Sequence, residues 1–223
     1  MILYNYDREV ITDFISYNPR SCFIMTQLGS PLPGSLIEIR KFLTAELEKR
    51  KLIELDANSY IQGKDFLNKI WKIILSVPMG IAIVTNEMKL STISNIFYEV
   101  GVLNALGKEI IVIKTKDFPI PSDFIRTEYI EFDDNFQPKI NNFFDQVFAL
   151  ADHYDVMAES LENNPNLSID YWRRAYLITG EDNFLRKAKK SFKENNFDTQ
   201  SKLFINNFLS TKLRLAKKKK TNR

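Results

Sequence analysis

Short apolar runs alternate with helix-length amphipathic segments between Ser21 and Phe132, and this alternation constrains the fold of the chain more than any other feature. We interpret the apolar runs as strands at residues 22–28, 51–55, 81–85, 109–113 and 128–132. The segments with helical periodicity are residues 35–50, residues 65–75 and a helix around Glu99 that a loop at 86–94 precedes. Strands separated by helices of this length form parallel sheets covered on both faces. The sequence therefore predicts a doubly wound, flavodoxin-like α/β fold.

The chain changes character after Pro138. Residues 140–150 are predicted to be helical, and no strand-like run follows them. Three further helices are indicated by the stretches YWRRAYLI, DNFLRKAKKSFKEN and SKLFINNFLSTKLRLA. We predict a leading helix over residues 1–20, an α/β domain over 21–150 and a helical appendage over 151–223 that ends in a basic tail.

The appendage is rich in aromatic residues, which allow two interpretations. They can form a core among the helices, or they can form a surface for self-association or for a partner protein. The residues concerned are Tyr171, Trp172, Tyr176, Phe184 and Phe192.

The cysteine and histidine counts exclude several kinds of chemistry. With one cysteine, Cys22, and one histidine, His153, among 223 residues, the chain can form no internal disulfide and is unsuited to a zinc site. Cys22 lies in the apolar run CFIM, where we expect a buried structural thiol. If the protein is an enzyme, its reactive group is therefore expected to be a carboxylate, with no metal and no cofactor.

Charge and hydropathy indicate where the chain works. No apolar stretch is long enough to span a membrane, and the start MILYNYDREVITDFI has no signal-peptide pattern, so we expect a cytoplasmic protein that binds no membrane. The net charge of +3 depends on a lysine run at Lys217 to Lys220. Such a run can contact the phosphates of a nucleic acid, but it is more often a solvated tail, so nucleic-acid binding is not the favoured interpretation.

Glu99 is the residue that most requires an explanation. It lies on the side of its predicted helix that also carries Ile96, Val100 and Leu103, where burial of an unpaired carboxylate costs several kcal/mol. Asn95 lies one turn earlier on the same face, and the nearby helix N-terminus is expected to favour the ionised carboxylate. Such a group can attack or stabilise an oxocarbenium ion, bind ribose hydroxyls, pair with a lysine or cap a loop. The residues alone leave these alternatives open.

Other candidate residues follow the predicted strands. Thr26, Gln27 and Gly29 come after the first strand, Asp56 ends the second, and Asn86 follows the third. In an open parallel sheet, ligands bind at the carboxyl ends of the strands near a switch in strand order. We therefore expect these five residues to line a substrate site.

The segment from Phe97 to Lys108 resembles a known family. Its residues FYEVG and, after a short gap, ALGK are similar to the E-x-G-x-x-x-A-L-G-K segment of nucleoside 2-deoxyribosyltransferases. The wider pattern over residues 20–132, with CFIM, DFLNKIWKII and PSDF, resembles deoxyribosyltransferase-like and TIR-like proteins, many of them encoded in bacterial defence loci. TIR domains that cleave NAD likewise carry a glutamate eight residues before a Gly-Lys pair.

The resemblance implies an N-glycosidase that cleaves the sugar–base bond of a nucleoside, nucleotide or NAD, in a defence setting and as a homo-oligomer. Glu99 would be the catalytic residue, and Asn95, the residues around Gln27 and Asp123 of the PSDF loop would bind substrate. One departure is Ile93, which occupies the position of an aspartate that handles the base in deoxyribosyltransferases. The alternative is therefore a nucleotide-sensing or partner-binding subunit that uses the same pocket without turnover.

Overall fold

The chain forms two compact units. In the computed structural model, residues 15–57, 66–122, 128–161 and 163–211 are described. The α/β unit is Arg20–Val147, and the helical unit combines Met1–Pro19 with Phe148–Arg223. Most of the predicted leading helix and all of the lysine run lie outside the described residues. The described part of that prediction, residues 15–20, is not helical and ends in a turn at 19–20.

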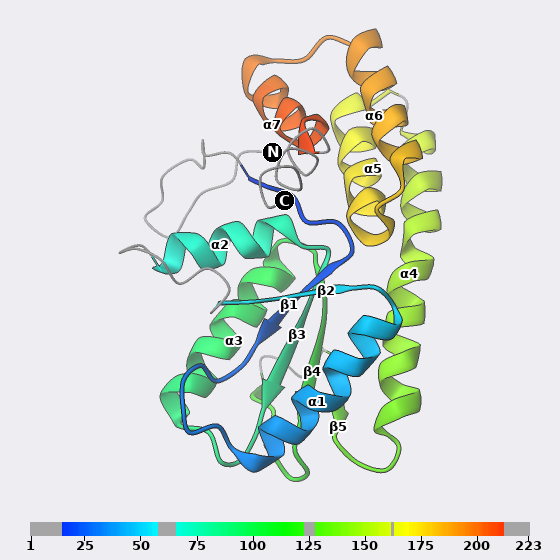
Figure 1. The fold of residues 1–223 in the computed structure, drawn as a ribbon. Helices are drawn as coiled ribbons and strands as arrows, with labels where there is room; N and C mark the ends of the chain where they lie inside the picture. Colours follow the sequence, from blue (N-terminus) through cyan, green and yellow to red (C-terminus); the bar gives the residue numbers. More distant parts are fainter. Residues whose placement is uncertain (1–14, 58–65, 123–127, 162, 212–223) are drawn as a thin grey trace, which may run out of the picture. The chain divides into compact units, whose positions relative to one another are not determined.

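A parallel sheet of five strands forms the centre of the α/β unit (Figure 1). Its strands are β1 (Ser21–Met25), β2 (Ile53–Asp56), β3 (Met79–Val84), β4 (Glu109–Lys114) and β5 (Glu128–Glu131). All pairings are parallel, and the strand order is β2-β1-β3-β4-β5. This is the doubly wound, flavodoxin-like order, with its switch point between β1 and β3. The predicted fold class is confirmed.

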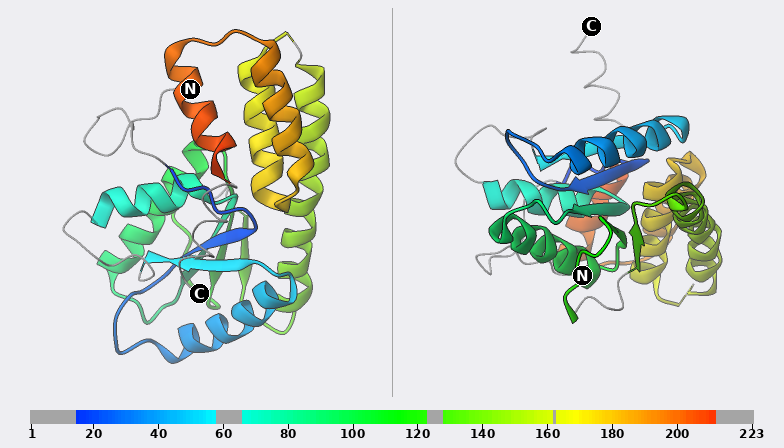
Figure 2. Two further views of the ribbon diagram at one scale, coloured as in Figure 1. Left: turned by 45° about the horizontal axis from the view of Figure 1, so that its top comes forward. Right: turned by 90° about the horizontal axis from the view of Figure 1, so that it is seen from below.

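Helices cover both faces of this sheet (Figure 2). They are α1 (Gly34–Lys49), α2 (Phe66–Ser76) and α3 (Leu90–Ala105). Asp56 of β2 lies 3.7 Å from Arg40 of α1, so Ile24, its register partner on β1, also faces α1. Gly80 of β3 faces α3, because a Cβ atom there would lie 2.9 Å from Leu103 Cδ1. The two faces of the sheet can therefore be assigned residue by residue.

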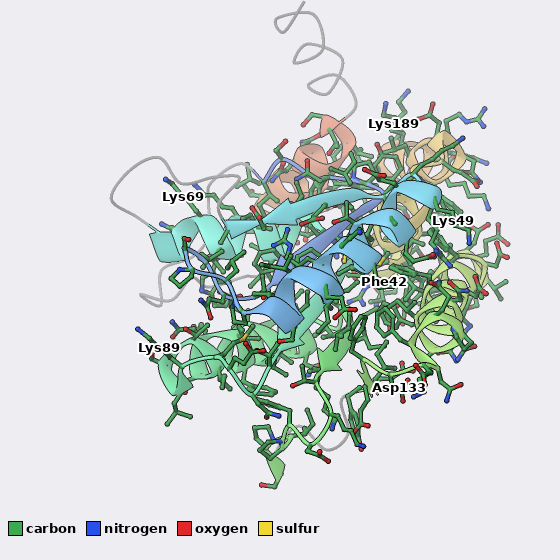
Figure 3. The ribbon with its side chains drawn as sticks, turned by 60° about the horizontal axis from the view of Figure 1, so that its bottom comes forward. Phe42, Lys49, Lys69, Lys89, Asp133 and Lys189 are labelled. Carbon is green, nitrogen blue, oxygen red and sulfur yellow. The ribbon has the colours of Figure 1, made fainter. Side chains whose placement is uncertain are left out.

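The helix α4 (Phe136–Ser160) is longer than predicted at both ends. Pro138 lies in its first turn, where the missing N–H group would have no partner within the helix anyway. Phe136 packs edge-to-face on Phe132, which in turn contacts Phe42 of α1. Phe42 is labelled in Figure 3. These rings attach the start of α4 to the face of the sheet that α1 covers. The boundary between the two units falls inside α4.

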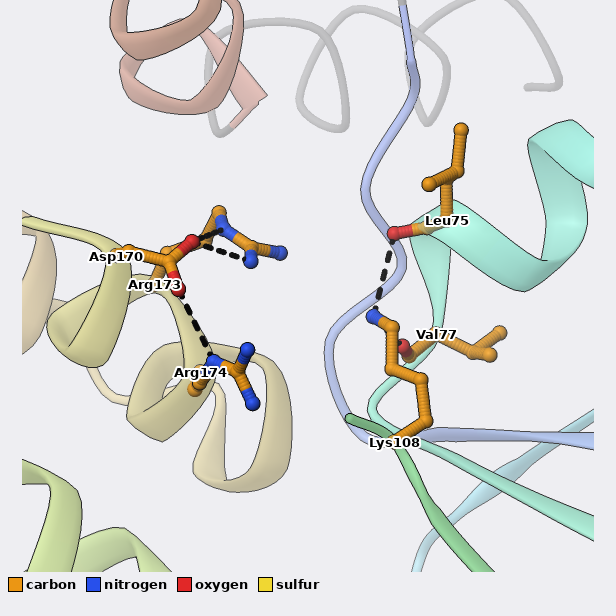
Figure 4. Close-up of polar contacts among 6 residues, drawn as sticks. All are labelled: Leu75, Val77, Lys108, Asp170, Arg173 and Arg174. Atoms are coloured by element: carbon orange, nitrogen blue, oxygen red, sulfur yellow. Dashed lines mark hydrogen bonds and ion pairs between the residues drawn. The ribbon is translucent and has the colours of Figure 1, made fainter. Parts of the chain in front are cut away.

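The helical unit continues with α5 (Pro165–Thr179), α6 (Asp182–Glu194) and α7 (Thr199–Leu209), which confirms the predicted appendage. Its aromatic residues contact one another: the ring centroids of Tyr154 and Tyr171 are 5.7 Å apart. The buried Arg173 is paired with Asp170 at 2.6 Å (Figure 4). Packing within the unit therefore accounts for much of its aromatic content.

Candidate active site

Glu99 lies deeper in its helix than predicted. α3 begins at Leu90, which makes Glu99 the tenth of its sixteen residues, and Lys89 before it points away from the sheet (Figure 3). The charge of a helix N-terminus acts mainly on the first turn. The prediction that this terminus stabilises an ionised Glu99 is therefore wrong.

The environment of Glu99 favours its protonated form. The side chain is half-buried beside the buried residues Ile96, Val100 and Leu103, as predicted. Burial raises the pKa of Glu99 to about 7, and no charged group among the described residues opposes this effect. Within the part of the chain that the structure describes, the carboxyl group has no hydrogen bond and no ion pair. At neutral pH, charged and neutral forms are thus both present in quantity.

The position of Glu99 along the sheet follows from its helix neighbours. Leu103 packs on Gly80, the second residue of β3. One turn earlier, Glu99 lies about 6 Å closer to the carboxyl edge of the sheet. Side chains on a helix slant toward its N-terminus, which carries the carboxyl group further in that direction. Glu99 therefore approaches the carboxyl edge from the α3 face.

An apolar groove lies on the other flank of α3. Its volume is about 500 Å³, and Trp71 of α2 and Tyr98, Gly101 and Ala105 of α3 are among its lining residues. Gly101 is two residues after Glu99, so the two point in directions about 160° apart around the helix. Glu99 does not line this groove. Its side chain points away from this groove and from Trp71 of α2.

An ion pair between a buried lysine and a partly exposed glutamate lies on the same face of the sheet as Glu99. Lys114, the last residue of β4, is the register partner of Val84, which shares the α3 face with Gly80. Its Nζ atom lies 2.5 Å from Glu131 Oε1 and 5.5 Å from the centroid of the Tyr129 ring. The prediction missed Lys114. The sequence could have marked Lys114 as a candidate, because it is a charged residue directly after the mainly apolar run EIIVI.

The three predicted site residues after β1 are Thr26, Gln27 and Gly29, which lie at the carboxyl edge of the sheet. Thr26 is 7% exposed, and its Oγ1 atom has no hydrogen-bond partner among the described residues. Gln27 uses its side-chain amide within the loop, donating to the carbonyl of Pro31 at 3.1 Å. Gly29 has φ of +86°, a conformation that favours glycine. The glycine at position 29 is thus explained by the loop backbone itself.

Asp56 and Asn86 have structural partners. Asp56 is paired with Arg40 of α1. Asn86 connects two loops, because its N–H donates to Thr115 Oγ1 at 3.2 Å and its Nδ2 donates to the carbonyl of Lys116 at 3.1 Å. Both residues lie at the carboxyl edge as predicted, but these contacts already occupy part of their polar groups.

The remaining predicted residues are Asn95 and Asp123. Asn95 is exposed one turn before Glu99, on the same flank of α3. Asp123 lies outside the described residues. The structure thus brings Thr26, Gln27, Gly29, Asp56 and Asn86 to one edge of the sheet, whereas Glu99 and Asn95 approach from the α3 face.

Two residues at the carboxyl edge were missed. Thr85 is fully buried after β3, and its Oγ1 atom has no partner among the described residues. Glu87 accepts a hydrogen bond from Ser35 of α1 at 2.5 Å. In the sequence, Thr85 comes at the end of the apolar run IAIVT, just as Thr26 comes after the apolar run CFIM. This similar position could have marked Thr85 as a candidate. A buried hydroxyl without a partner costs about 1–3 kcal/mol, so each needs an explanation.

Part of the family-like motif has a structural explanation. The C-cap of α3 is Leu106, one residue before the glycine that was predicted to end the helix. Gly107 follows it with φ of +62°, the left-handed conformation common just after a helix, and its N–H donates to the carbonyl of Asn104 at 2.9 Å. The Nζ atom of Lys108 donates to the carbonyls of Val77 at 2.6 Å and Leu75 at 3.4 Å, at the end of α2 (Figure 4). The fold therefore accounts for the Gly-Lys pair, while it offers no such explanation for Glu99.

Fold and site define a doubly wound α/β protein with a carboxyl group near the carboxyl edge of its sheet that has no partner among the described residues. Comparison with protein-family models, curated proteins and solved structures gave no match for the chain. Among the described residues, no cluster of histidine, cysteine or acidic side chains is placed to hold a metal ion. No helix in the described ranges is long and apolar enough to cross a membrane.

Proposed function

We propose that the α/β unit cleaves the N-glycosidic bond of a nucleoside, nucleotide or NAD, with Glu99 as its catalytic carboxylate. The observation that carries this proposal is the state of Glu99. Its carboxyl group is half-buried, has no partner among the described residues and has a pKa raised to about 7. Strongly perturbed carboxyl groups of this kind are concentrated at functional sites.

The chemistry requires the ionised form of Glu99. As the bond between the anomeric carbon and the base nitrogen breaks, the base leaves with the bonding electrons and positive charge develops on the sugar. The carboxylate either stabilises this oxocarbenium ion or attacks the anomeric carbon. Water then supplies the hydroxyl group for the sugar and the proton for the base. Partial burial strengthens the attraction between carboxylate and cation.

The carboxyl edge provides the expected place for the substrate. Thr26, Gln27 and Gly29 border the switch point between β1 and β3, where ligands bind in open α/β sheets. Asn95 is exposed on the flank of α3 that carries Glu99 and offers an amide to a substrate there. A role in defence against phage rests on the resemblance alone.

The test is base release from a panel of substrates. The full chain is incubated with NAD, nucleotides and nucleosides, and free base is separated by chromatography. We expect release from at least one substrate and a loss of about 100-fold or more in Glu99→Gln. Glu48→Gln, on an exposed part of α1, is the matched control and should keep full activity. An inactive wild type, or equal release by Glu99→Gln, would contradict the proposal.

A second candidate is a nucleotide-sensing subunit that binds without turnover. Ile93 favours it, because this residue replaces the aspartate of deoxyribosyltransferases with a side chain that cannot handle a base by hydrogen bonding. This candidate predicts nucleotide binding by the wild type with no product, and the same binding in Glu99→Gln.

A further inference from the structure

Four polar side chains at the switch point are not used by the chemistry proposed for Glu99. Thr26 follows β1, Thr85 follows β3, Glu87 lies in the next loop, and Ser35 is the second residue of α1. The two strands are neighbours in the sheet. The four residues thus gather where β1, β3 and the start of α1 meet.

The two threonine hydroxyls lie on the α1 face of the sheet. Ile24 and Ile81 are register partners that face α1, because Ile24 is also paired with Asp56, which contacts Arg40 of that helix. Thr26 and Thr85 follow these isoleucines by two and four residues, so alternation places them on the same face. They are 7% and 0% exposed, and neither Oγ1 atom has a partner among the described residues. Two hydroxyls that have no partner among the described residues thus follow neighbouring strands on the face of the sheet that α1 covers.

Glu87 connects the loop after β3 to this helix start. Its Oε1 atom accepts a hydrogen bond from Ser35 Oγ at 2.5 Å. The residue before α1, Pro33, provides no side-chain cap. A helix N-terminus attracts anions, and here the carboxylate of Glu87 supplies the negative charge through Ser35. A phosphate group at the same place would be repelled by Glu87.

We propose that Glu87 is a ribose-binding residue that selects ribonucleosides over their 2′-deoxy counterparts. A carboxylate only accepts hydrogen bonds, and two neighbouring hydroxyl groups of a ribose can donate to its two oxygens. An acidic residue serves the ribose in this way in dinucleotide-binding α/β sheets. Ser35 holds the carboxylate in place, and Thr26 and Thr85 supply hydroxyl partners for the sugar beneath it. The inference refines the proposed function by naming its substrate class, but it concerns binding alone.

The test is equilibrium binding by calorimetry. The probes are adenosine, guanosine, cytidine and uridine with their 2′-deoxy counterparts, and the protein is the full chain carrying Glu99→Gln, so that no turnover occurs. We expect the best ribonucleoside to bind about 10-fold or more tightly than its deoxy counterpart. Adding Glu87→Gln should bring this ratio close to one. Ser35→Ala should lower it partly, because the carboxylate loses the group that orients it.

The controls separate this inference from the proposed catalysis. Glu48→Gln should leave the binding ratio unchanged, and urea unfolding should show that the Glu87 and Ser35 variants fold. Equal binding of ribose and deoxyribose compounds, no nucleoside binding, or a ratio that Glu87→Gln does not alter would overturn the inference. Base release that depends on Glu99 with no ribose preference would refute this inference alone. A Glu87-dependent ribose preference in a protein that releases no base would refute only the catalytic proposal.

Discussion

Replacing Glu99 by glutamine should stabilise the protein, and the gain should depend on pH. The pKa of Glu99 is raised by burial from 4.5 to about 7. The folded state therefore binds more protons than the unfolded state between these two pH values, and stability falls as pH rises through that range. At about 1.4 kcal/mol for each pH unit, the wild type loses about 3 kcal/mol by pH 8 relative to pH 4.5. Glutamine has the size of glutamic acid and no charge to lose.

Urea unfolding at a series of pH values measures this effect. We expect Glu99→Gln to match the wild type near pH 4.5 and to be more stable by up to about 3 kcal/mol at pH 8. Glu48→Gln, the exposed control on α1, should change stability by less than about 0.5 kcal/mol at either pH. A glutamine variant that is less stable than the wild type at pH 8 would refute the reasoning, because it would show that the charged form of Glu99 is stabilised in the fold.

Three further substitutions test the fold by urea unfolding. Gly29→Ala should cost about 1 kcal/mol, because φ of +86° is unfavourable for alanine; no loss would show that the loop adjusts freely. Gly80→Val should cost about 1–3 kcal/mol, since a side chain there meets Leu103, and a neutral result would contradict the close contact. Asp170→Asn should cost about 3–5 kcal/mol, because it removes the carboxylate that neutralises the buried Arg173. Burial alone would raise the pKa of Asp170, but its arginine neighbours lower it to about 2, so the wild type should lose this stabilisation as pH falls from about 4 to 2.

The sequence predicted the fold class because each apolar run is too short for a helix and lies between amphipathic segments. The strand positions were correct to within a few residues. The largest boundary error is at α4, where Pro138 was treated as a point at which the chain changes character. Its position in the first turn of the helix makes it compatible with α4. The observed strand order is that of the predicted flavodoxin-like sheet, and it places the switch point between β1 and β3.

The site was predicted less well, for a physical reason that concerns the start of α3. The helix begins at Leu90 after Lys89, which provides no side-chain cap, so the sequence carries no capping signal there. The helix was therefore expected to start later, which placed Glu99 too close to the N-terminus. Contacts between distant segments, such as the one from Ser35 to Glu87, have no local signal in the sequence.

The pH dependence of base release tests the central claim most directly. On the best substrate of the panel, kcat/KM of the wild type should rise with pH through an apparent pKa near 7 and then level off, because only the ionised Glu99 can stabilise or attack the sugar cation. Glu99→Gln should lose the activity across the whole range. A wild-type rate that does not change between pH 5 and 9, or a glutamine variant with the same profile, would contradict the account.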